Sequence, residues 1–272
     1  MTSRTEWSHV AAAYDRSFAT LCSGTAGPLL EAVLEALDDP EPGCLTPRLL
    51  DVGCGTGLVA QVALERGFSV IAADPDDGMR SLTTARLGSR ASVVSAGLPR
   101  LPFADGEFEA TLANFVVNHV DDPRASVSEL ARVTAPGHPV AITIWPQHGS
   151  TSAALFAEVI QRSGAVQPET SSLPPERDFD RDVSGLSTLL DAAGITRTAG
   201  DEIDVPWRIH PEDLWLGVTG GVAGIGRIWS AQPPAVQARM RAAYGDVVPA
   251  YLQGGLLSLP SRAVLCVGLA SA

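Results

Sequence analysis

The stretch LLDVGCGTG, residues 49–57, decides the fold of this chain. It begins within a short apolar segment (48–53) that is typical of a β-strand, and its glycines lead directly into a helical pattern (58–67). Glycines at a junction of this kind let the backbone turn sharply and approach a ligand closely. The stretch therefore predicts a ligand-binding turn between a strand and a helix.

A regular alternation of strands and helices extends outward from this turn. Further strands are predicted at 69–74, 91–96, within 108–120, and at 138–145, with helical segments between them. Alternation of this kind predicts a parallel sheet with helices on both faces, which is an α/β fold of the Rossmann-like type.

The pattern is less regular after Trp145. Helices are predicted near 151–162 and 183–193, and the last two strands at 196–207 and 261–270. About fifty residues rich in Gly, Pro and Trp separate those strands, which is far more than a hairpin requires. We expect them to form a helical cap. Its cluster of glycines (217–226) is compatible with a hinge or with close helix packing.

Composition limits the classes of partner. The chain has 272 residues and a formal net charge of −12, which argues against a nucleic-acid substrate, because phosphate binding needs a positive surface. No apolar run approaches the ~20 residues of a membrane span, and the N-terminus lacks the apolar core of a signal peptide. We therefore expect a cytoplasmic protein with no membrane partner and a small-molecule substrate. The oligomeric state stays open.

The four cysteines are scattered and lack the spacing of metal ligands, so no metal site is predicted. Cys54 lies inside the glycine turn, where it fills space or contacts the ligand; a covalent role is not expected.

The spacing of the turn indicates the kind of ligand. Dinucleotide-binding loops read GxGxxG and present a helix N-terminus to a pyrophosphate. Here Gly53, Gly55 and Gly57 are spaced one residue more tightly, and Asp51 precedes the first glycine by two places. A carboxylate at Asp51 attracts a cationic amino-acid tail, and Asp74, which closes the second strand, can accept hydrogen bonds from ribose hydroxyls.

Several motifs then agree in order and spacing. They are the glycine turn, Asp74, LPFADGEFEA (101–110), ANFVVNHVDDP (113–123) and SELARVTAPGHPVAI (128–142). On these motifs, residues 48–145 resemble the core of the class I S-adenosylmethionine (SAM)-dependent methyltransferases, closest to the branch of ubiquinone/menaquinone-biosynthesis enzymes and small-molecule methyltransferases.

The resemblance implies a seven-stranded, mostly parallel sheet whose last strand is antiparallel. It implies one domain over 1–272, with an N-terminal helical lid (1–40), a SAM-binding core (48–147) and a substrate and cap region (148–260) interleaved with the last strands. It also implies that SAM is bound by the following residues: Tyr14, Asp51, Gly53, Cys54, Gly55, Gly57, Asp74, Met79, Gly97, Leu98 and Asn114.

The sequence departs from the family pattern at one of these positions. Many relatives carry an Asp shortly before the LPF motif, where it accepts a hydrogen bond from the adenine amino group. Gly97 occupies that place here. We expect the backbone at Gly97 and Leu98, or water, to replace the carboxylate.

Two histidines are candidates for a catalytic base. His119 follows the fourth strand and His148 follows the fifth, so both are expected at the carboxyl edge of the sheet, where ligands of α/β proteins bind. A positioned imidazole can remove a proton from an acceptor such as a phenol. Each histidine is equally compatible with a packing or surface role. His210, at the start of the cap, is expected to begin a helix.

The sequence thus predicts a SAM-dependent methyltransferase acting on a small organic metabolite by O- or N-methylation, with secondary metabolism as one setting. Two alternatives stay open. One is a methyltransferase-like protein that uses bound SAM for a non-methylating reaction such as cyclisation. The other is a non-catalytic SAM-binding module.

Overall fold

A seven-stranded sheet forms the centre of the molecule in the computed structural model, which describes residues 7, 9–37, 46–147, 150–169 and 172–271. Its strands are β1 (Arg48–Val52), β2 (Ser69–Ala73), β3 (Ser92–Val94), β4 (Ala110–Asn114), β5 (Pro139–Ile144), β6 (Ile195–Val205) and β10 (Ser261–Ala270). Their spatial order is β3-β2-β1-β4-β5-β10-β6. β10 runs antiparallel to both of its neighbours, and every other pair of neighbouring strands in this sheet is parallel, so the predicted fold class is confirmed.

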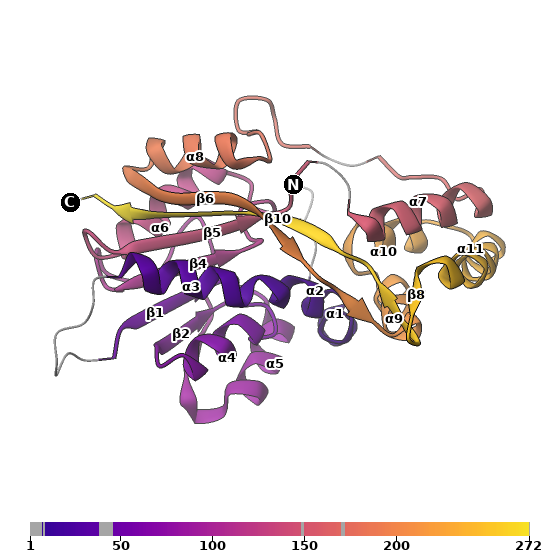
Figure 1. The fold of residues 1–272 in the computed structure, drawn as a ribbon, viewed down its shortest axis with the longest axis horizontal. Helices are drawn as coiled ribbons and strands as arrows, with labels where there is room; N and C mark the ends of the chain where they lie inside the picture. Colours follow the sequence, from indigo (N-terminus) through magenta and orange to yellow (C-terminus); the bar gives the residue numbers. More distant parts are fainter. Residues whose placement is uncertain (1–6, 8, 38–45, 148–149, 170–171, 272) are drawn as a thin grey trace.

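Helices cover both faces of this sheet (Figure 1). One face packs against α3 (Ala26–Ala36), α4 (Leu58–Glu65) and α5 (Asp77–Leu87). The other packs against α6 (Pro123–Val133) and α8 (Val183–Ala192). Because helices cover both faces, the strands β1, β4 and β5 consist almost entirely of inaccessible residues. Parallel strands that are covered on both faces are expected to be apolar along nearly their whole length.

Side-chain caps fix where several helices begin. Asp76 accepts the backbone N–H of Met79 at the start of α5, and Asp122 accepts that of Ala125 at the start of α6. Asp182 does the same for α8. Each cap of this type stabilises the folded chain by roughly 1 kcal/mol.

A second cluster of elements forms the cap. It contains α7 (Thr151–Ser163), α9 (Pro211–Thr219), α10 (Ala223–Ser230), α11 (Pro234–Val247) and a small antiparallel sheet of β7 (Arg208–Ile209), β8 (Leu252–Gln253) and β9 (Leu256–Ser258). These elements share their own hydrophobic core, which includes Trp207, Trp215 and Tyr244. The helical insertion before the last strand was predicted, whereas the small sheet was not.

The N-terminal helices lie between the central sheet and the cap (Figure 1). They are α1 (Ala11–Arg16) and α2 (Phe18–Cys22), followed by the 3₁₀ turn η1 (Ser23–Thr25). A Cβ atom added at Gly217 of α9 would overlap Ser17, which lies between α1 and α2, and one added at Gly220, directly after α9, would overlap Ala13 of α1. These glycines of the cap therefore serve close helix packing. The two remaining 3₁₀ turns of the described chain are η2 (Gly88–Arg90) and η3 (Val248–Tyr251).

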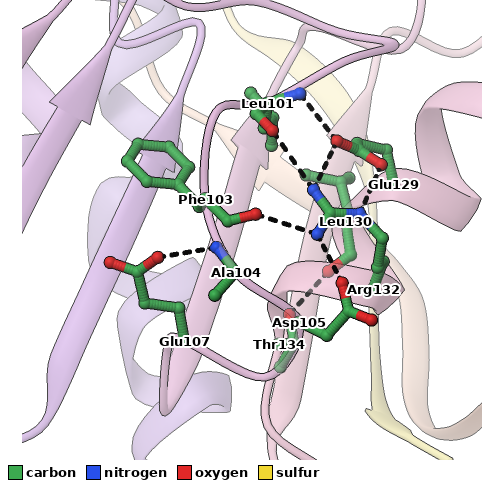
Figure 2. A network of polar contacts seen from close by, with 9 residues as sticks. All are labelled: Leu101, Phe103, Ala104, Asp105, Glu107, Glu129, Leu130, Arg132 and Thr134. Carbon is green, nitrogen blue, oxygen red and sulfur yellow. Dashed lines mark hydrogen bonds and ion pairs between the residues drawn. The ribbon is translucent and has the colours of Figure 1, made fainter.

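An arginine-centred network holds the loop between β3 and β4 (Figure 2). The guanidinium of Arg132 donates to the carbonyl oxygens of Leu101 and Phe103 and to the carboxylates of Asp105 and Glu129. The carboxylate of Glu129 in turn accepts the backbone N–H of Leu101 at 2.6 Å. The LPFADGEFEA motif is thus fixed to α6, directly after the segment at Gly97 and Leu98.

Candidate functional site

The glycine turn has the backbone geometry that the sequence predicts. Gly53, Gly55 and Gly57 have φ angles of 66°, 56° and 82°, in the left-handed region that side chains disfavour. The N–H groups of Gly53 and Cys54 both donate to the carbonyl oxygen of Ala73, at 2.7 and 3.0 Å. The turn is therefore bound to the end of the neighbouring strand β2.

Two of these glycines are also required by close contacts. A Cβ at Gly53 would lie 2.5 Å from a methyl carbon of Val116, and one at Gly57 would lie 2.9 Å from a methyl carbon of Thr83. The Thr83 hydroxyl donates to the carbonyl oxygen of Gly55 at 2.7 Å. Thr83 thus fixes the turn from α5. This role could not be predicted from local spacing, because Thr83 lies 28 residues from Gly55, in an otherwise ordinary helix.

Asp51 is buried in β1 at the floor of the site, with 1% of its surface exposed. Its Oδ2 atom has no hydrogen-bond partner in the part of the chain that the structure describes. Burial, with the nearby charge of Asp74, raises the pKa of Asp51 to about 7. A buried carboxylate oxygen without a partner is costly and calls for a cationic or hydrogen-donating ligand.

Asp74 lies directly after β2 and forms the second carboxylate of the site. Its Oδ2 atom accepts the N–H of Gly55 at 3.0 Å, and its Oδ1 atom accepts the N–H of Asp76 at 2.9 Å. Burial raises the pKa of Asp74 to about 6, although both backbone N–H groups act in the opposite direction. Each oxygen keeps a further lone pair, so Asp74 can hold the turn and still accept bonds from a ligand.

Tyr14 of α1 lies over the glycine turn. A Cβ added at Gly55 would be 3.7 Å from the Tyr14 ring, and Tyr14 lines the same cavity as Asp51, Cys54 and Asn114. Burial raises the pKa of the Tyr14 phenol well above its usual value. The cavity measures about 30 Å³, room for only a few water molecules. Tyr14 of α1, together with Ala19 and Cys22 of α2, thus forms one wall of this cavity.

An ion pair connects α1 to the core beside this cavity. The Arg86 guanidinium donates to both carboxylate oxygens of Asp15, at 2.9 and 3.1 Å, and also to the carbonyl oxygen of Thr56 in the turn. Its partners belong to segments 30 and 71 residues away in sequence, so the pairing could not be found from local spacing.

Asn114 lies at the end of β4, where the sequence placed it. Its side-chain oxygen accepts the hydroxyls of Thr25 and Thr143, and its side-chain nitrogen donates to the carbonyl oxygen of Cys22 at 3.0 Å. Asn114 lines the cavity and at the same time attaches the end of α2 to the sheet. Both the oxygen and the nitrogen of its side-chain amide are thus hydrogen-bonded to protein groups.

The predicted adenine-side residues lie on neighbouring segments. Met79 is buried in the first turn of α5, and Leu98 packs against the core below β3. Gly97 faces the ring of Pro75, because an added Cβ would lie 3.1–3.2 Å from three of its carbons. Any side chain at this position would therefore press against the Pro75 ring.

Cys54 is a buried thiol within the turn. Burial, with the charges of Asp51 and Asp74, raises its pKa above the usual range of cysteine. A thiol that does not ionise is a poor nucleophile. A covalent role, which was not expected, therefore has no support in the geometry, and Cys54 lines the cavity at the turn.

The candidate catalytic histidines have different outcomes. His119 is an exposed residue in the turn after β4, with its ring 6.1 Å from that of Trp7 in an edge-on arrangement. His148 lies outside the described residues. His210 starts α9, and its ring nitrogen accepts the N–H of Glu212, as expected of a helix cap. A catalytic role for His119 or His148 stays a prediction.

Two aromatic residues at the sheet edge were not singled out by the sequence. The rings of Phe115 and Trp145 stack at 3.7 Å with an angle of 9° between them. Phe115 has a φ of 58°, an outlier for a bulky residue, and its N–H donates to Thr143. Such backbone strain clusters at functional sites. The pair forms a rigid apolar wall directly after β4 and β5.

Other classes of site have no support in the described ranges. No group of three or more His, Cys, Asp or Glu within them could hold a metal ion. No helix in the same ranges has the length and apolar character needed to cross a membrane.

Comparisons with known proteins agree with this geometry. Residues 50–142 match the family described as a methyltransferase domain. The demethylmenaquinone methyltransferase of Clavibacter sepedonicus is 34% identical over 135 residues, which are 49% of this chain and 54% of that protein. The chain spans about half the length of the curated relatives it matches.

Solved structures share the fold at low sequence identity. The [4+2]-cyclase SpnF has a TM-score of 0.52 and 18% identity, with 90% of this chain and 81% of that chain covered. Phosphoethanolamine N-methyltransferase 2 of Haemonchus contortus, solved with S-adenosylhomocysteine, has a TM-score of 0.51 and 14% identity, with coverages of 91% and 52%. At these identities the likeness concerns the fold alone.

Proposed function

We propose that this chain, whose residues 50–142 match a methyltransferase domain, is a class I SAM-dependent methyltransferase that transfers a methyl group from SAM to a small organic metabolite. The observation that carries the proposal is the unpartnered, buried Oδ2 atom of Asp51 beneath the left-handed glycine turn. This atom suits the ammonium group of an amino-acid tail, and a phosphate would be repelled by Asp51 and Asp74 together.

The residues of the site fit SAM in distinct ways. Asp51 holds the ammonium, directly or through water, and the glycine turn lies against the methionine portion. Asp74 accepts from the ribose hydroxyls while it keeps the N–H of Gly55 in place. Met79 packs near the adenine, and the backbone at Gly97 and Leu98 faces the adenine amino group. When bound, SAM supplies a methyl group that is already activated by a positively charged sulfur.

The protein's own contribution is alignment and the exclusion of water. We propose that α1 and α2 are the moving part of the lid. This segment is shorter than the predicted lid of 1–40, because α3 packs its Leu29, Leu30 and Val33 into the core and so belongs to the fixed part of the molecule. Tyr14 then covers the turn, and the stacked pair Phe115–Trp145 limits the space at the sheet edge. Residues 148–260, together with α2, are proposed to bind the acceptor.

Proton removal depends on the acceptor. An acceptor that carries an acidic hydroxyl would need a base, and His119 is the described histidine that lies at the carboxyl edge of the sheet after β4. Its replacement by Gln should lower the rate at pH 7 and leave SAM affinity unchanged. Equal rates for the two proteins would remove His119 from the mechanism.

Incubation with methyl-labelled SAM and a library of small neutral and charged metabolites tests the proposal. The expected result is a labelled product together with an equal amount of S-adenosylhomocysteine. Calorimetry that detects no SAM binding at millimolar concentration would contradict it. Tight binding of SAM without methyl consumption, but with conversion of a metabolite, would instead support the cyclase-like alternative, which the shared fold allows.

A further inference from the structure

We propose that a groove between α2, α7 and α10 binds the apolar body of the methyl acceptor, and that this acceptor is neutral and elongated. The inference rests on the proposed methyl transfer, and it adds the chemical class of the acceptor. The groove measures about 280 Å³, much larger than the cavity at the glycine turn and close to the lower end of the range for small-molecule sites.

The lining of the groove determines the chemistry of its occupant. Its walls include Phe18 of α2, Phe156 and Ile160 of α7, and Ile225 and Ile228 of α10. Among the described residues that line it, none carries a charged side chain, and the polar ones are Ser152 and Gln167. A charged ligand would lose its hydration there without gaining a partner. The occupant is therefore neutral and mostly apolar.

The helix α2 connects this groove to the cofactor cavity. Phe18 lines the groove, whereas Ala19, Cys22 and the adjoining Ser23 line the cavity that holds Asp51 and the glycine turn. The two spaces are thus separated by one helix, whose diameter with side chains is about 10 Å. A molecule with its body in the groove and its reactive group at the cofactor must extend over roughly that distance.

The backbone at the rim of the groove has an unusual conformation, which is an observation separate from the apolar lining. Ala223, the first residue of α10, has a φ of 59°, which residues with a side chain rarely adopt. A Cβ added at the neighbouring Gly224 would meet no atom within 4 Å. Strain of this kind collects at ligand-binding segments. The first turn of α10 is therefore both strained and open toward the groove.

A fluorescence titration with a neutral probe tests the groove. N-phenyl-1-naphthylamine should bind the wild-type protein, and its sulfonated analogue 1-anilinonaphthalene-8-sulfonate should bind at least tenfold more weakly. Ala157→Glu introduces a charge on an exposed, groove-lining position of α7 and should weaken binding of the neutral probe at least tenfold. Ala154→Glu, exposed on the same helix but away from the groove lining, should change nothing. Equal binding of both probes, or equal behaviour of both variants, would overturn the proposal.

A second measurement separates this inference from the proposed function. Calorimetry with S-adenosylhomocysteine should give the same affinity for the wild type, Ala157→Glu and Ala154→Glu. An acceptor found with labelled SAM should displace N-phenyl-1-naphthylamine, and its KM should rise at least tenfold in Ala157→Glu alone. An acceptor that is charged, or that leaves the probe bound, overturns the groove assignment while methyl transfer stands. Failure of the wild type to bind S-adenosylhomocysteine defeats the proposed function instead.

Discussion

Asp51 combines a cost for folding with a benefit for binding. Its carboxylate is buried, its Oδ2 atom is unpartnered in the described structure, and its pKa is raised to about 7. A carboxyl group whose pKa is higher in the folded than in the unfolded state destabilises the fold as it ionises. The penalty is absent near pH 4, grows as the pH rises, and is complete above pH 7.

We therefore expect Asp51→Asn to stabilise the protein and to weaken its affinity for the ligand. At pH 8 the variant should exceed the wild type in unfolding free energy by roughly 2–4 kcal/mol, and near pH 4 the two should be similar. Urea titrations across this pH range check the expectation. A constant difference between pH 4 and pH 8 would show that the carboxylate carries no buried charge.

The same ionisation predicts how binding depends on pH. Asp51 must be ionised to attract an ammonium group, so the affinity for S-adenosylhomocysteine should rise as the pH increases from 5.5 to 7.5 and then level off. Calorimetry at several pH values measures this, with Asp51→Asn as the control that lacks the rise. A flat profile for the wild type would contradict the role given to Asp51.

Gly97 provides a second test on a single residue. Because an added Cβ would lie 3.1 Å from the Pro75 ring, Gly97→Asp should destabilise the fold by about 1–3 kcal/mol and should not improve affinity for S-adenosylhomocysteine. Ser95→Asp, at an exposed position two residues earlier, is the matched control. Tighter binding by Gly97→Asp would contradict this expectation. It would show that the fold has room for Asp at position 97 and that a carboxylate there improves adenine binding.

Sequence spacing could predict only part of the site at this scale. Asp51, the three glycines and Asp74 were predictable because each is fixed by its position in one strand or one turn. Thr83, Arg86 and the pair Phe115–Trp145 were not, because their roles depend on contacts with segments far away in the chain. Phe115 also adopts a backbone conformation that its residue type disfavours.

Among the elements, α1 is the one whose attachment should control access to the cavity. Asp15→Asn removes the charge from the bidentate pair with Arg86, which holds α1 against the turn. We expect a weaker closed state and a rise of about tenfold in the Kd for S-adenosylhomocysteine, corresponding to ~1.4 kcal/mol. Calorimetry and stopped-flow dissociation measure the effect.

The control for this element is another ion pair of α1. Arg16 pairs with Asp213 of α9, and 66% of its side chain is exposed. Exposed pairs contribute little, so Arg16→Ala should change the Kd by less than about threefold. If the two variants weaken binding equally, the Asp15–Arg86 pair has no special part in lid closure.

The loop between β3 and β4 is held in place by Arg132 (Figure 2). Arg132→Lys keeps the charge but loses the planar fork that reaches two carbonyl oxygens and two carboxylates. The expected loss of unfolding free energy is about 1–3 kcal/mol, read from urea titrations. Arg262→Lys, whose ion pairs are largely exposed, should lose less than about 0.5 kcal/mol.

The elements themselves were largely predictable, with errors at their ends. Strand and helix periodicity gave the central sheet, because its strands are apolar runs bounded by glycines and capping residues. The small sheet of β7, β8 and β9 escaped prediction because β7 and β8 have only two residues each and β9 three. Strands this short carry no alternation, and their pairing depends on the packing of the cap.

The whole molecule consists of a sheet-centred core and a cap with its own hydrophobic cluster, and α1 and α2 lie between them (Figure 1). The parallel sheet followed from the sequence pattern, and its antiparallel last strand followed from the family resemblance. The helical character of the cap was predicted as well, but the role of its aromatic residues was not, because they pack with one another: the rings of Trp215 and Tyr244 are 4.7 Å apart. Whether such residues face a ligand or a core cannot be distinguished from composition.

The account depends most on the identity of the ligand at the glycine turn. Calorimetric titration of the wild type and of Asp74→Asn with S-adenosylhomocysteine, and of the wild type with NAD⁺, measures it directly. The account predicts binding by the wild type, at least tenfold weaker binding by Asp74→Asn, and no detectable binding of NAD⁺. Binding of NAD⁺ at this turn, or wild-type protein that fails to bind S-adenosylhomocysteine at millimolar concentration, would contradict it.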